Sequence, residues 1–274
     1  MKINGIKQRL AKNEPSFLTT LHLFDPAVYE MASMIGVDGI WMDMEHRTFS
    51  METAQLLLTA TRAGGDADVL LRVSRGEMSS VTRALECGAQ GVIYPRCESP
   101  EEAREVVRNA KFAPLGQRGC DGWNRDAPFG TMPLNDYIAA ANEQTLVVIQ
   151  IESPAALELA PEIAKVDGVD VLMFGPGDYS VLAGVPGQMR SSAVLNASRR
   201  VCEAALSAGK HFAQPAGSLE AAEELMAMGG RIIFHDADIL MVNRGLRAMQ
   251  EMFKPYRSDS AKAPTPAVAK RPYE

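Results

Sequence analysis

Polar side chains that can bind ions or carry protons follow several apolar segments of this 274-residue sequence. The segments cover residues 39–43, 68–72, 146–152 and 170–175, and the side chains within, ending or following them are Asp43, His46, Arg72, Gln150, Glu152 and Asp178. The set combines carboxylates, a histidine, an arginine and an amide. Such groups could bind a divalent cation, hold an anionic substrate and move a proton.

Glu152 and Asp178 follow two expected strands that would be neighbours in a parallel sheet, about 5 Å apart. Two carboxylates at that spacing repel each other unless one is protonated or a cation lies between them. Oxygen ligands with open positions suit Mg²⁺ or Mn²⁺, and a 2-oxo acid could complete the coordination. In the alternative interpretation, Glu152 contacts the start of a helix and Asp178 caps a turn.

His46, Arg72 and the turn at Gly177 could serve the same chemistry. Asp43, three residues before His46, could hold one tautomer of the imidazole and so make a base for use near neutral pH. Arg72 could fork onto a carboxylate or an enolate oxygen, and backbone N–H groups of the turn could face an anion. Structural roles stay open for all three: a structural histidine, a salt bridge within the fold and an ordinary tight turn.

The placement of lysine argues against covalent amine catalysis. A Schiff-base enzyme needs a lysine at the functional end of a strand. Of the nine lysines, only Lys210 adjoins an expected strand, and it precedes that strand. A GxxxxGK[ST] loop is also absent, which gives nucleotide phosphoryl transfer little support.

The composition is that of a soluble globular protein, with 46% hydrophobic and 23% charged residues. The formal net charge of −6 argues against nucleic acid or an anionic membrane as the main partner. The sequence has no apolar run long enough to cross a bilayer and no visible secretory signal. Four cysteines without a CxxC pair indicate a reduced, cytoplasmic protein.

Eight apolar segments alternate with eight helical patterns, which predicts a (β/α)₈ TIM barrel. Strands are expected at 17–21, 39–43, 68–72, 91–95, 146–152, 170–175, 211–215 and 231–235, and helices at 26–35, 51–63, 78–87, 100–110, 154–165, 194–208, 218–228 and 238–253. A doubly wound open sheet is the main alternative, although no GxGxxG follows the first strand. In a barrel, active sites form at the carboxyl ends of the strands, where the polar residues above would meet.

The alternation predicts a single barrel domain over residues 1–254. Residues 113–136 interrupt it as a long insertion rich in Gly, Pro and Asn, in which Trp123 and Phe129 predict packing and order. Residues 255–274 are rich in Pro, Ala and Lys and are expected to form a disordered tail.

Six motifs carry a resemblance to a known enzyme family. They are WMDMEH (41–46), LLRV (70–73), ECGAQGVIYP (86–95), FAPLGQRG (112–119), VIQIES (148–153) and FGPGDYS (174–180). From about residue 15 to 253, the chain resembles the metal-dependent, pyruvate-specific class II aldolases of the HpcH/HpaI family. The resemblance implies a (β/α)₈ barrel assembled as a homohexamer, a trimer of dimers, with the last helix exchanged between subunits.

The resemblance also implies roles for the site residues. Glu152 and Asp178 would be the ligands of Mg²⁺, Mn²⁺ or Co²⁺. Arg72 would stabilise a pyruvate enolate. Gln150, with backbone groups near Gly177 and Asp178, would hold the pyruvate.

His46, oriented by Asp43, would move protons and, directly or through water, remove the proton of the substrate's C4 hydroxyl. Glu45 would hydrogen-bond within the site. Glu86 stands where the family often has an aspartate associated with the acceptor aldehyde of a neighbouring subunit.

The activity that the resemblance implies is reversible retro-aldol cleavage of a 4-hydroxy-2-oxo acid to pyruvate and an aldehyde, in sugar-acid or aromatic-acid catabolism. One alternative is a sister lyase that uses the same enolate, such as an oxaloacetate decarboxylase or a CoA-ester lyase. Another is a non-catalytic barrel that binds a carboxylate ligand.

Overall fold

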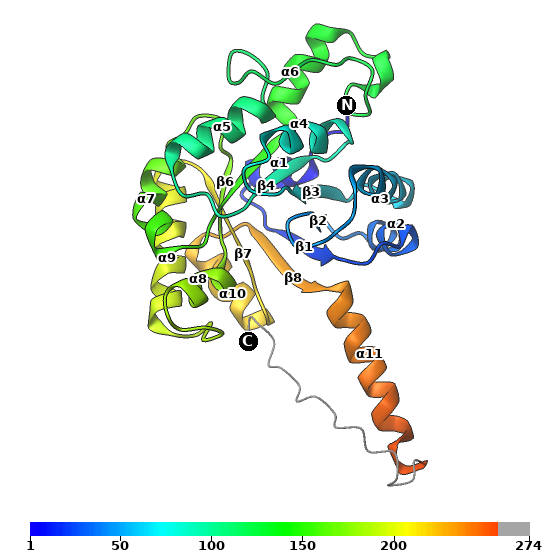
Figure 1. The fold of residues 1–274 in the computed structure, drawn as a ribbon, viewed down its shortest axis with the longest axis vertical. Coiled ribbons are helices and arrows are strands. Elements are labelled where there is room, and N and C mark those ends of the chain that lie inside the picture. Colours follow the sequence, from blue (N-terminus) through cyan, green and yellow to red (C-terminus); the bar gives the residue numbers. More distant parts are fainter. Residues whose placement is uncertain (257–274) are drawn as a thin grey trace.

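The computed structural model describes residues 1–256 as a closed barrel of eight parallel strands surrounded by helices (Figure 1). The strands are β1 (Ser16–Leu21), β2 (Gly39–Asp43), β3 (Asp68–Arg72), β4 (Gly91–Tyr94), β5 (Leu146–Ile151), β6 (Val171–Phe174), β7 (His211–Pro215) and β8 (Ile232–Ala237). Each strand pairs with the next along the chain, and β8 pairs with β1. The predicted (β/α)₈ barrel is therefore confirmed, and the open sheet is excluded.

The eight predicted helices are present, with ends within two residues of those expected. They are α2 (Pro26–Ile35), α3 (Met51–Gly64), α4 (Met78–Glu86), α5 (Pro100–Ala110), α7 (Pro154–Ala164), α9 (Ser192–Ser207), α10 (Leu219–Met228) and α11 (Asp238–Phe253). The additional helices that the sequence did not predict are α1 (Gly5–Ala11), α6 (Leu134–Gln144) and α8 (Pro176–Leu182), with short 3₁₀ turns η1 (Pro128–Gly130) and η2 (Lys254–Tyr256).

Capping and helix length account for part of this difference. The Ser99 hydroxyl accepts a hydrogen bond from the Glu102 amide, and the Ser153 hydroxyl accepts one from the Ala156 amide, so α5 and α7 begin at recognisable caps. Helices α6 and α8 begin with no side-chain cap, and α1 is only 7 residues long. A missing cap is not the whole reason, because α4 and α11 also begin with no side-chain cap and were predicted.

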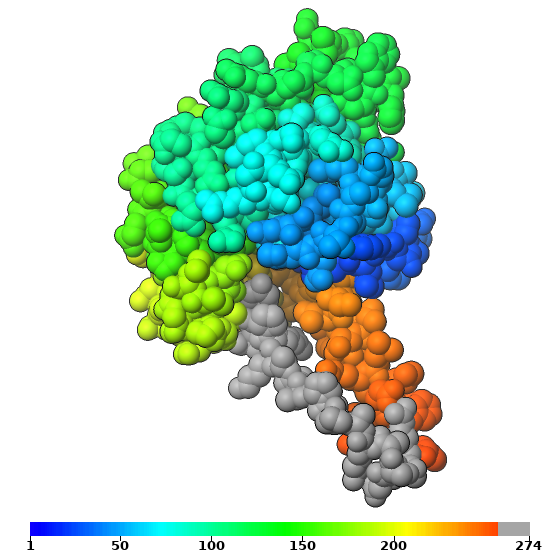
Figure 2. All heavy atoms as spheres, in the orientation of Figure 1, coloured from blue at the N-terminus to red at the C-terminus, as the bar shows by residue number. Residues whose placement is uncertain are grey.

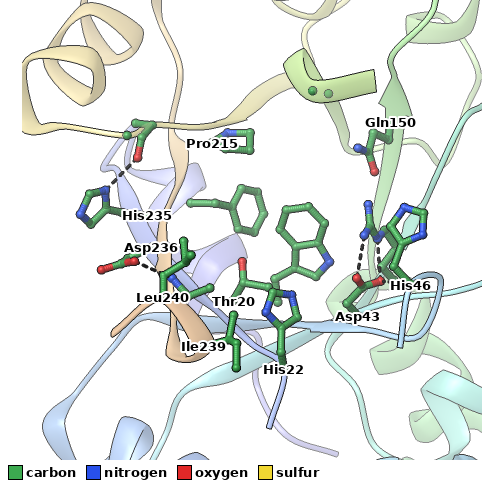
Figure 3. A pocket seen from close by; sticks show the side chains of 18 of the residues that line it. Thr20, His22, Asp43, His46, Gln150, Pro215, His235, Asp236, Ile239 and Leu240 are labelled. Carbon is green, nitrogen blue, oxygen red and sulfur yellow. Dashed lines mark hydrogen bonds and ion pairs between the residues drawn. The ribbon is translucent and has the colours of Figure 1, made fainter. Parts of the chain in front are cut away.

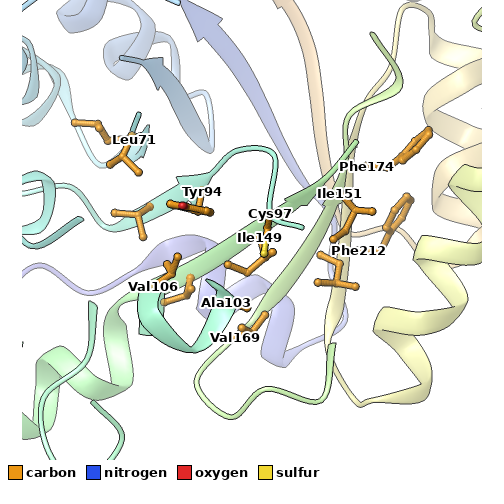
Figure 4. Packing of buried hydrophobic residues seen from close by; sticks show 14 of the residues in the cluster. Leu71, Tyr94, Cys97, Ala103, Val106, Ile149, Ile151, Val169, Phe174 and Phe212 are labelled. Atoms are coloured by element: carbon orange, nitrogen blue, oxygen red, sulfur yellow. The ribbon is translucent and has the colours of Figure 1, made fainter. Parts of the chain in front are cut away.

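The strands are apolar because both of their faces are buried. One large cluster lies between the barrel and its helices, where Tyr94, Ile149, Phe174 and Phe212 pack (Figure 4). A second cluster fills the barrel interior and includes Trp41 and other inward-facing strand residues. A parallel sheet covered in this way shows no alternation of polar and apolar residues.

Helix α1 closes the amino-terminal end of the barrel. Its Ile6 and Leu10 pack into the interior cluster. The carboxylate of Asp68 at the start of β3 accepts the Ile6 amide at 2.8 Å and pairs with Lys2. Because this end is plugged, any cavity within the barrel opens at the carboxyl ends of the strands.

Helix α11 does not pack along its own barrel. It leaves the end of β8 and projects from the body of the molecule (Figures 1 and 2). Only Asp238 of this helix is buried. Its exposed apolar side chains are Ile239, Leu240, Met241, Val242, Leu246, Met249, Met252 and Phe253. The exchange of this helix between subunits stays a prediction.

The insertion at 113–136 is only partly as expected. Arg118 and Asp126 are buried and paired at 3.0 Å, but Trp123 and Phe129 are 76% and 61% exposed. The two rings therefore contribute little to the expected packing of the segment, which rests instead on buried residues such as Arg118, Asp126 and Ala127. Of the tail predicted to be disordered at 255–274, residues 255 and 256 belong to η2, and residues 257–274 lie outside the described residues. Among residues 1–256, no helix combines the length and apolarity needed to cross a membrane.

Candidate active site

A cavity of about 350 Å³ lies at the carboxyl ends of the strands (Figure 3). The structure brings all seven predicted site residues to its walls: Asp43, His46, Arg72, Gln150, Glu152, Gly177 and Asp178. They lie in or just after strands β2, β3 and β5 and in the first turn of α8. The rule that active sites form at this end of a barrel therefore located the residues correctly.

The carboxylate of Glu152 is almost completely buried, with 1% of the residue exposed. It accepts hydrogen bonds from the Arg96 amide at 2.8 Å and from Nε2 of Gln150 at 2.6 Å. Burial, and then the neighbouring charge of Asp178, raise the pKa of Glu152 to about 8. A bound cation would relieve the repulsion between these two carboxylates and favour their charged forms.

The donor set fits a hard divalent cation. Glu152 and Asp178 offer carboxylate oxygens, and the buried Oε1 of Gln150 has no hydrogen-bond partner among the described residues. No group of three or more His, Cys, Asp or Glu side chains with ligand geometry occurs within residues 1–256. The protein would thus supply two carboxylates and leave the remaining positions to water and substrate.

Arg72 is buried and held from several sides. Its Nε and Nη2 donate to the two oxygens of Asp43 at 2.9 and 2.8 Å, and Nη1 lies 3.2 Å from Oε2 of Glu45. The guanidinium also stacks 4.6 Å from the ring centre of Trp41. Burial alone would raise the pKa of Asp43, but Arg72 outweighs it and lowers that pKa below its usual value. The arginine is fixed before any substrate binds.

His46 is placed differently from the prediction. The Asp43 carboxylate was expected to hold its imidazole, but this carboxylate is occupied by Arg72 and by the backbone amides of Glu45 and His46. The His46 ring is 60% exposed, and its Nε2 lies 3.7 Å from Oε2 of Glu45. Asp43 therefore positions the main chain of His46, and its charge serves the buried arginine instead of the exposed ring.

The expected tight turn at Gly177 is the first turn of helix α8. Gly175, just before it, was not singled out by the sequence. A Cβ atom there would lie 2.3 Å from Oε2 of Glu152 and 2.8 Å from Nε2 of Gln150. Glycine is required at this position so that both side chains can occupy the site.

The opposite wall of the cavity was also missed. It is formed after β1, at the ends of β7 and β8 and by the first turn of α11, with Thr20, His22, Pro215, Phe234, His235, Asp236, Ile239 and Leu240. Figure 3 shows His235 and Asp236 across the cavity from Asp43 and His46. Inspection of the ends of β1 and β8 would have found them. Glu86, at the end of α4, does not line this cavity.

Comparison with known proteins gives one consistent group. A sequence model of the HpcH/HpaI aldolase/citrate lyase family matches residues 18–238. A hydroxypyruvate/pyruvate aldolase of Delftia acidovorans is 31% identical over 264 residues, which cover 95% of this chain and 96% of the relative.

Solved structures agree with this result. A HpcH/HpaI aldolase/citrate lyase family protein from Burkholderia cenocepacia is 33% identical, with a TM-score of 0.83 over 93% of this chain and 100% of the other. Citrate synthase SbnG is 25% identical, with a TM-score of 0.84 over 92% of this chain and 98% of the other.

Proposed function

Because the chain belongs to the HpcH/HpaI aldolase/citrate lyase family, we propose that it is a class II, pyruvate-dependent aldehyde-lyase. It cleaves a 4-hydroxy-2-oxo acid reversibly to pyruvate and an aldehyde. The observation that carries the proposal is the buried Glu152 carboxylate beside Asp178, in one cavity with the fixed guanidinium of Arg72. The name of the Delftia relative, a hydroxypyruvate/pyruvate aldolase, supports pyruvate as the shared product.

Glu152 and Asp178 would hold Mg²⁺, Mn²⁺ or Co²⁺. When bound, this cation supplies a Lewis acid that stabilises negative charge on the enolate oxygen. Gln150 and the backbone near Gly177 line the same end of the cavity and orient the pyruvate part of the substrate. Gly175 keeps that end open for Glu152 and Gln150.

Arg72, Asp43 and His46 have different roles in the proposed cleavage. A base removes the proton of the C4 hydroxyl, the C3–C4 electron pair passes into the enolate, and the aldehyde leaves. Arg72 donates hydrogen bonds where negative charge develops, and Asp43 holds it in place for that purpose. His46, at the rim of the cavity, carries protons between the reacting centre and solvent, including the proton that returns to C3.

A sister reaction on the same enolate is the second candidate. The similarity to citrate synthase SbnG favours a chemistry that joins or releases an enolate with a different partner. Oxaloacetate decarboxylation needs the cation site at Glu152 and Asp178, together with Arg72, but it involves no aldehyde. Comparing turnover of oxaloacetate with that of pyruvate plus an aldehyde separates the two.

The assembly proposed is a homohexamer in which α11 covers the barrel of a neighbouring subunit. The support is the row of exposed apolar side chains on this helix, which a soluble monomer rarely leaves open to water. Light scattering should give a hexamer mass, and a monomer mass would contradict this assembly.

The four cysteines are free, which supports the cytoplasm as the location.

The direct test of the proposed activity is metal depletion. Cleavage of a 4-hydroxy-2-oxo acid should stop in EDTA and return when Mg²⁺, Mn²⁺ or Co²⁺ is added. Full activity of metal-free protein would refute the mechanism.

A further inference from the structure

A second histidine, His22, lines the same cavity from the opposite side. It directly follows β1, whereas Glu152 follows β5, and these strands face each other across an eight-stranded closed barrel. Figure 3 shows His22 between Thr20 and Asp43 at the cavity wall. A keto acid that is anchored at Glu152 and Asp178 would extend its far end toward this wall.

The imidazole of His22 has a carboxylate behind it. Its Nδ1 is buried, has no hydrogen-bond partner and lies 3.8 Å from Oδ1 of Asp238. Asp238 is itself held rigidly, since it accepts the backbone amides of His22, Leu23 and Ile239 at 2.7–2.9 Å. With Nδ1 facing Asp238, Nε2 is the nitrogen left to face the cavity.

The carboxylate lies on the Nδ1 side of the ring at 3.8 Å, beyond hydrogen-bond distance, so Asp238 acts on the imidazole through its charge. The side chain of His22 is 16% exposed, whereas that of His46 is 60% exposed. Burial and the nearby Arg47 lower the pKa of His22, against the opposing effects of Asp238 and Asp43. The ring is therefore neutral near pH 7 and able to accept a proton, and Asp238 would stabilise the cation so formed.

We propose that His22 is a further catalytic residue, which hydrogen-bonds through Nε2 to the C4 oxygen of the substrate and takes the C4-hydroxyl proton during cleavage. The inference rests on the proposed aldolase function. The O–H bond breaks, its electron pair forms the C=O of the aldehyde, and the C3–C4 pair becomes the enolate. In the addition direction His22 gives the same proton back to the alkoxide. His46 is then left to serve proton transfer at C3.

The test separates the two ends of the reaction. Exchange of the pyruvate methyl protons in D₂O, with Mg²⁺, Mn²⁺ or Co²⁺ present, requires only the enolate end. Aldol addition of pyruvate to acetaldehyde, glycolaldehyde or propanal also requires the acceptor end. His22→Ala should lower the addition rate about 10²-fold while the exchange rate stays within about threefold of wild type.

His22→Gln places an amide near the former Nε2 but cannot carry a proton. It should recover the KM for the aldehyde and not the kcat, a split that a structural role would not produce. His46→Ala should instead lose both exchange and addition, because addition needs the enolate as well. His211→Asn, at the start of β7 on the other end of the barrel, is the matched control and should change neither rate.

Equal loss of exchange and addition in His22→Ala, or no loss of either, would overturn the role of His22. So would a wild-type protein that exchanges pyruvate protons but adds none of the three aldehydes. Absence of exchange in the wild-type protein with all three metals would instead refute the proposed function itself.

Discussion

The two ends of the barrel both contain buried polar side chains, but they differ in how these are satisfied. At the amino-terminal end, Asn4 donates to the carbonyls of Gln90 and Gln144, and Lys111 donates to the carbonyls of Asn142 and Thr145. At the carboxyl end, the buried atoms without a hydrogen-bond partner within residues 1–256 include Nδ1 of His22 and Oε1 of Gln150, together with Nε1 of Trp41.

This difference separates stability from function. A buried polar group that has its hydrogen bonds contributes to the fold, whereas one left without a partner costs free energy. Glu152 has hydrogen bonds, but its charged form is costly, because burial and the neighbouring charge of Asp178 raise its pKa to about 8. His22, Gln150 and Glu152 thus line a cavity where a ligand can satisfy them. Asn4 and Lys111 instead have their partners within the protein, although the buried Ser16 hydroxyl at their end has none among the described residues.

The largest expected effect is a loss of turnover from a substitution at the carboxyl end of the barrel. Glu152→Gln should reduce turnover by about 10³-fold or more, since one ligand for the cation is lost. The pKa of Glu152 in the folded protein lies above its ordinary value of 4.5. At neutral pH, burying this residue therefore costs free energy relative to its solvated state in the unfolded chain. The melting temperature in EDTA should therefore stay equal or rise. A clear fall in melting temperature would show that the Glu152 carboxylate stabilises the fold. It would then contradict the proposed difference between the two ends of the barrel.

Arg72 should contribute both to the stability of the fold and to turnover. Arg72→Met leaves Asp43 buried without its partner, which should cost about 3–5 kcal/mol of unfolding free energy. It should also lower turnover by about 10²–10³-fold, because a fixed donor to the developing charge is gone. Denaturant unfolding and steady-state kinetics measure the two effects. The double variant Arg72→Met/Asp43→Leu should regain stability and not turnover; recovery of turnover would exclude a role of Arg72 in the reaction.

The amino-terminal end should give the opposite result. Asn4→Ala removes the cap of α1 and the side-chain donor to the carbonyls of Gln90 and Gln144, of which Gln90 keeps the Leu146 amide. The unfolding free energy should fall by about 1–3 kcal/mol, while kcat at a temperature where the protein stays folded should not change. Loss of kcat in the folded variant would mean that the two ends are coupled.

The smallest effect expected is a pH dependence at Lys111. Burial lowers its pKa from 10.5 to about 8, partly opposed by Asp170. Between these values the unfolded chain binds more protons than the folded protein, so this residue makes stability rise with pH. The unfolding free energy of the wild type relative to Lys111→Met should increase from pH 8 to 10.5. A flat difference would show that this lysine keeps its ordinary pKa.

The sequence predicted the barrel and most of the site because both depend on local patterns. Ser-Pro caps and apolar segments placed the strands and most helices, and the ends of the strands then located Glu152 and Arg72. The pairing of Asp43 could not be predicted in this way. His46 is close in sequence, but only the register of β2 and β3, which sets Asp43 opposite Arg72, decides which group the carboxylate meets.

Other features depend on contacts between distant segments. The need for glycine at position 175 comes from Glu152 and Gln150 on the neighbouring strand. The role of His22 depends on Asp238, which is 216 residues away. The direction of α11 is set by tertiary structure, because its apolar pattern suits packing on its own barrel and on another subunit equally well.

The most direct test of the central claim is proton exchange of pyruvate in D₂O, followed by the loss of its methyl ¹H NMR signal. The Glu152 and Asp178 site, with Arg72, predicts exchange in the presence of Mg²⁺, Mn²⁺ or Co²⁺, arrest in EDTA and recovery when the metal is returned. Exchange that continues unchanged in EDTA, or that is absent with all three metals, would contradict a metal-dependent enolate at this end of the barrel.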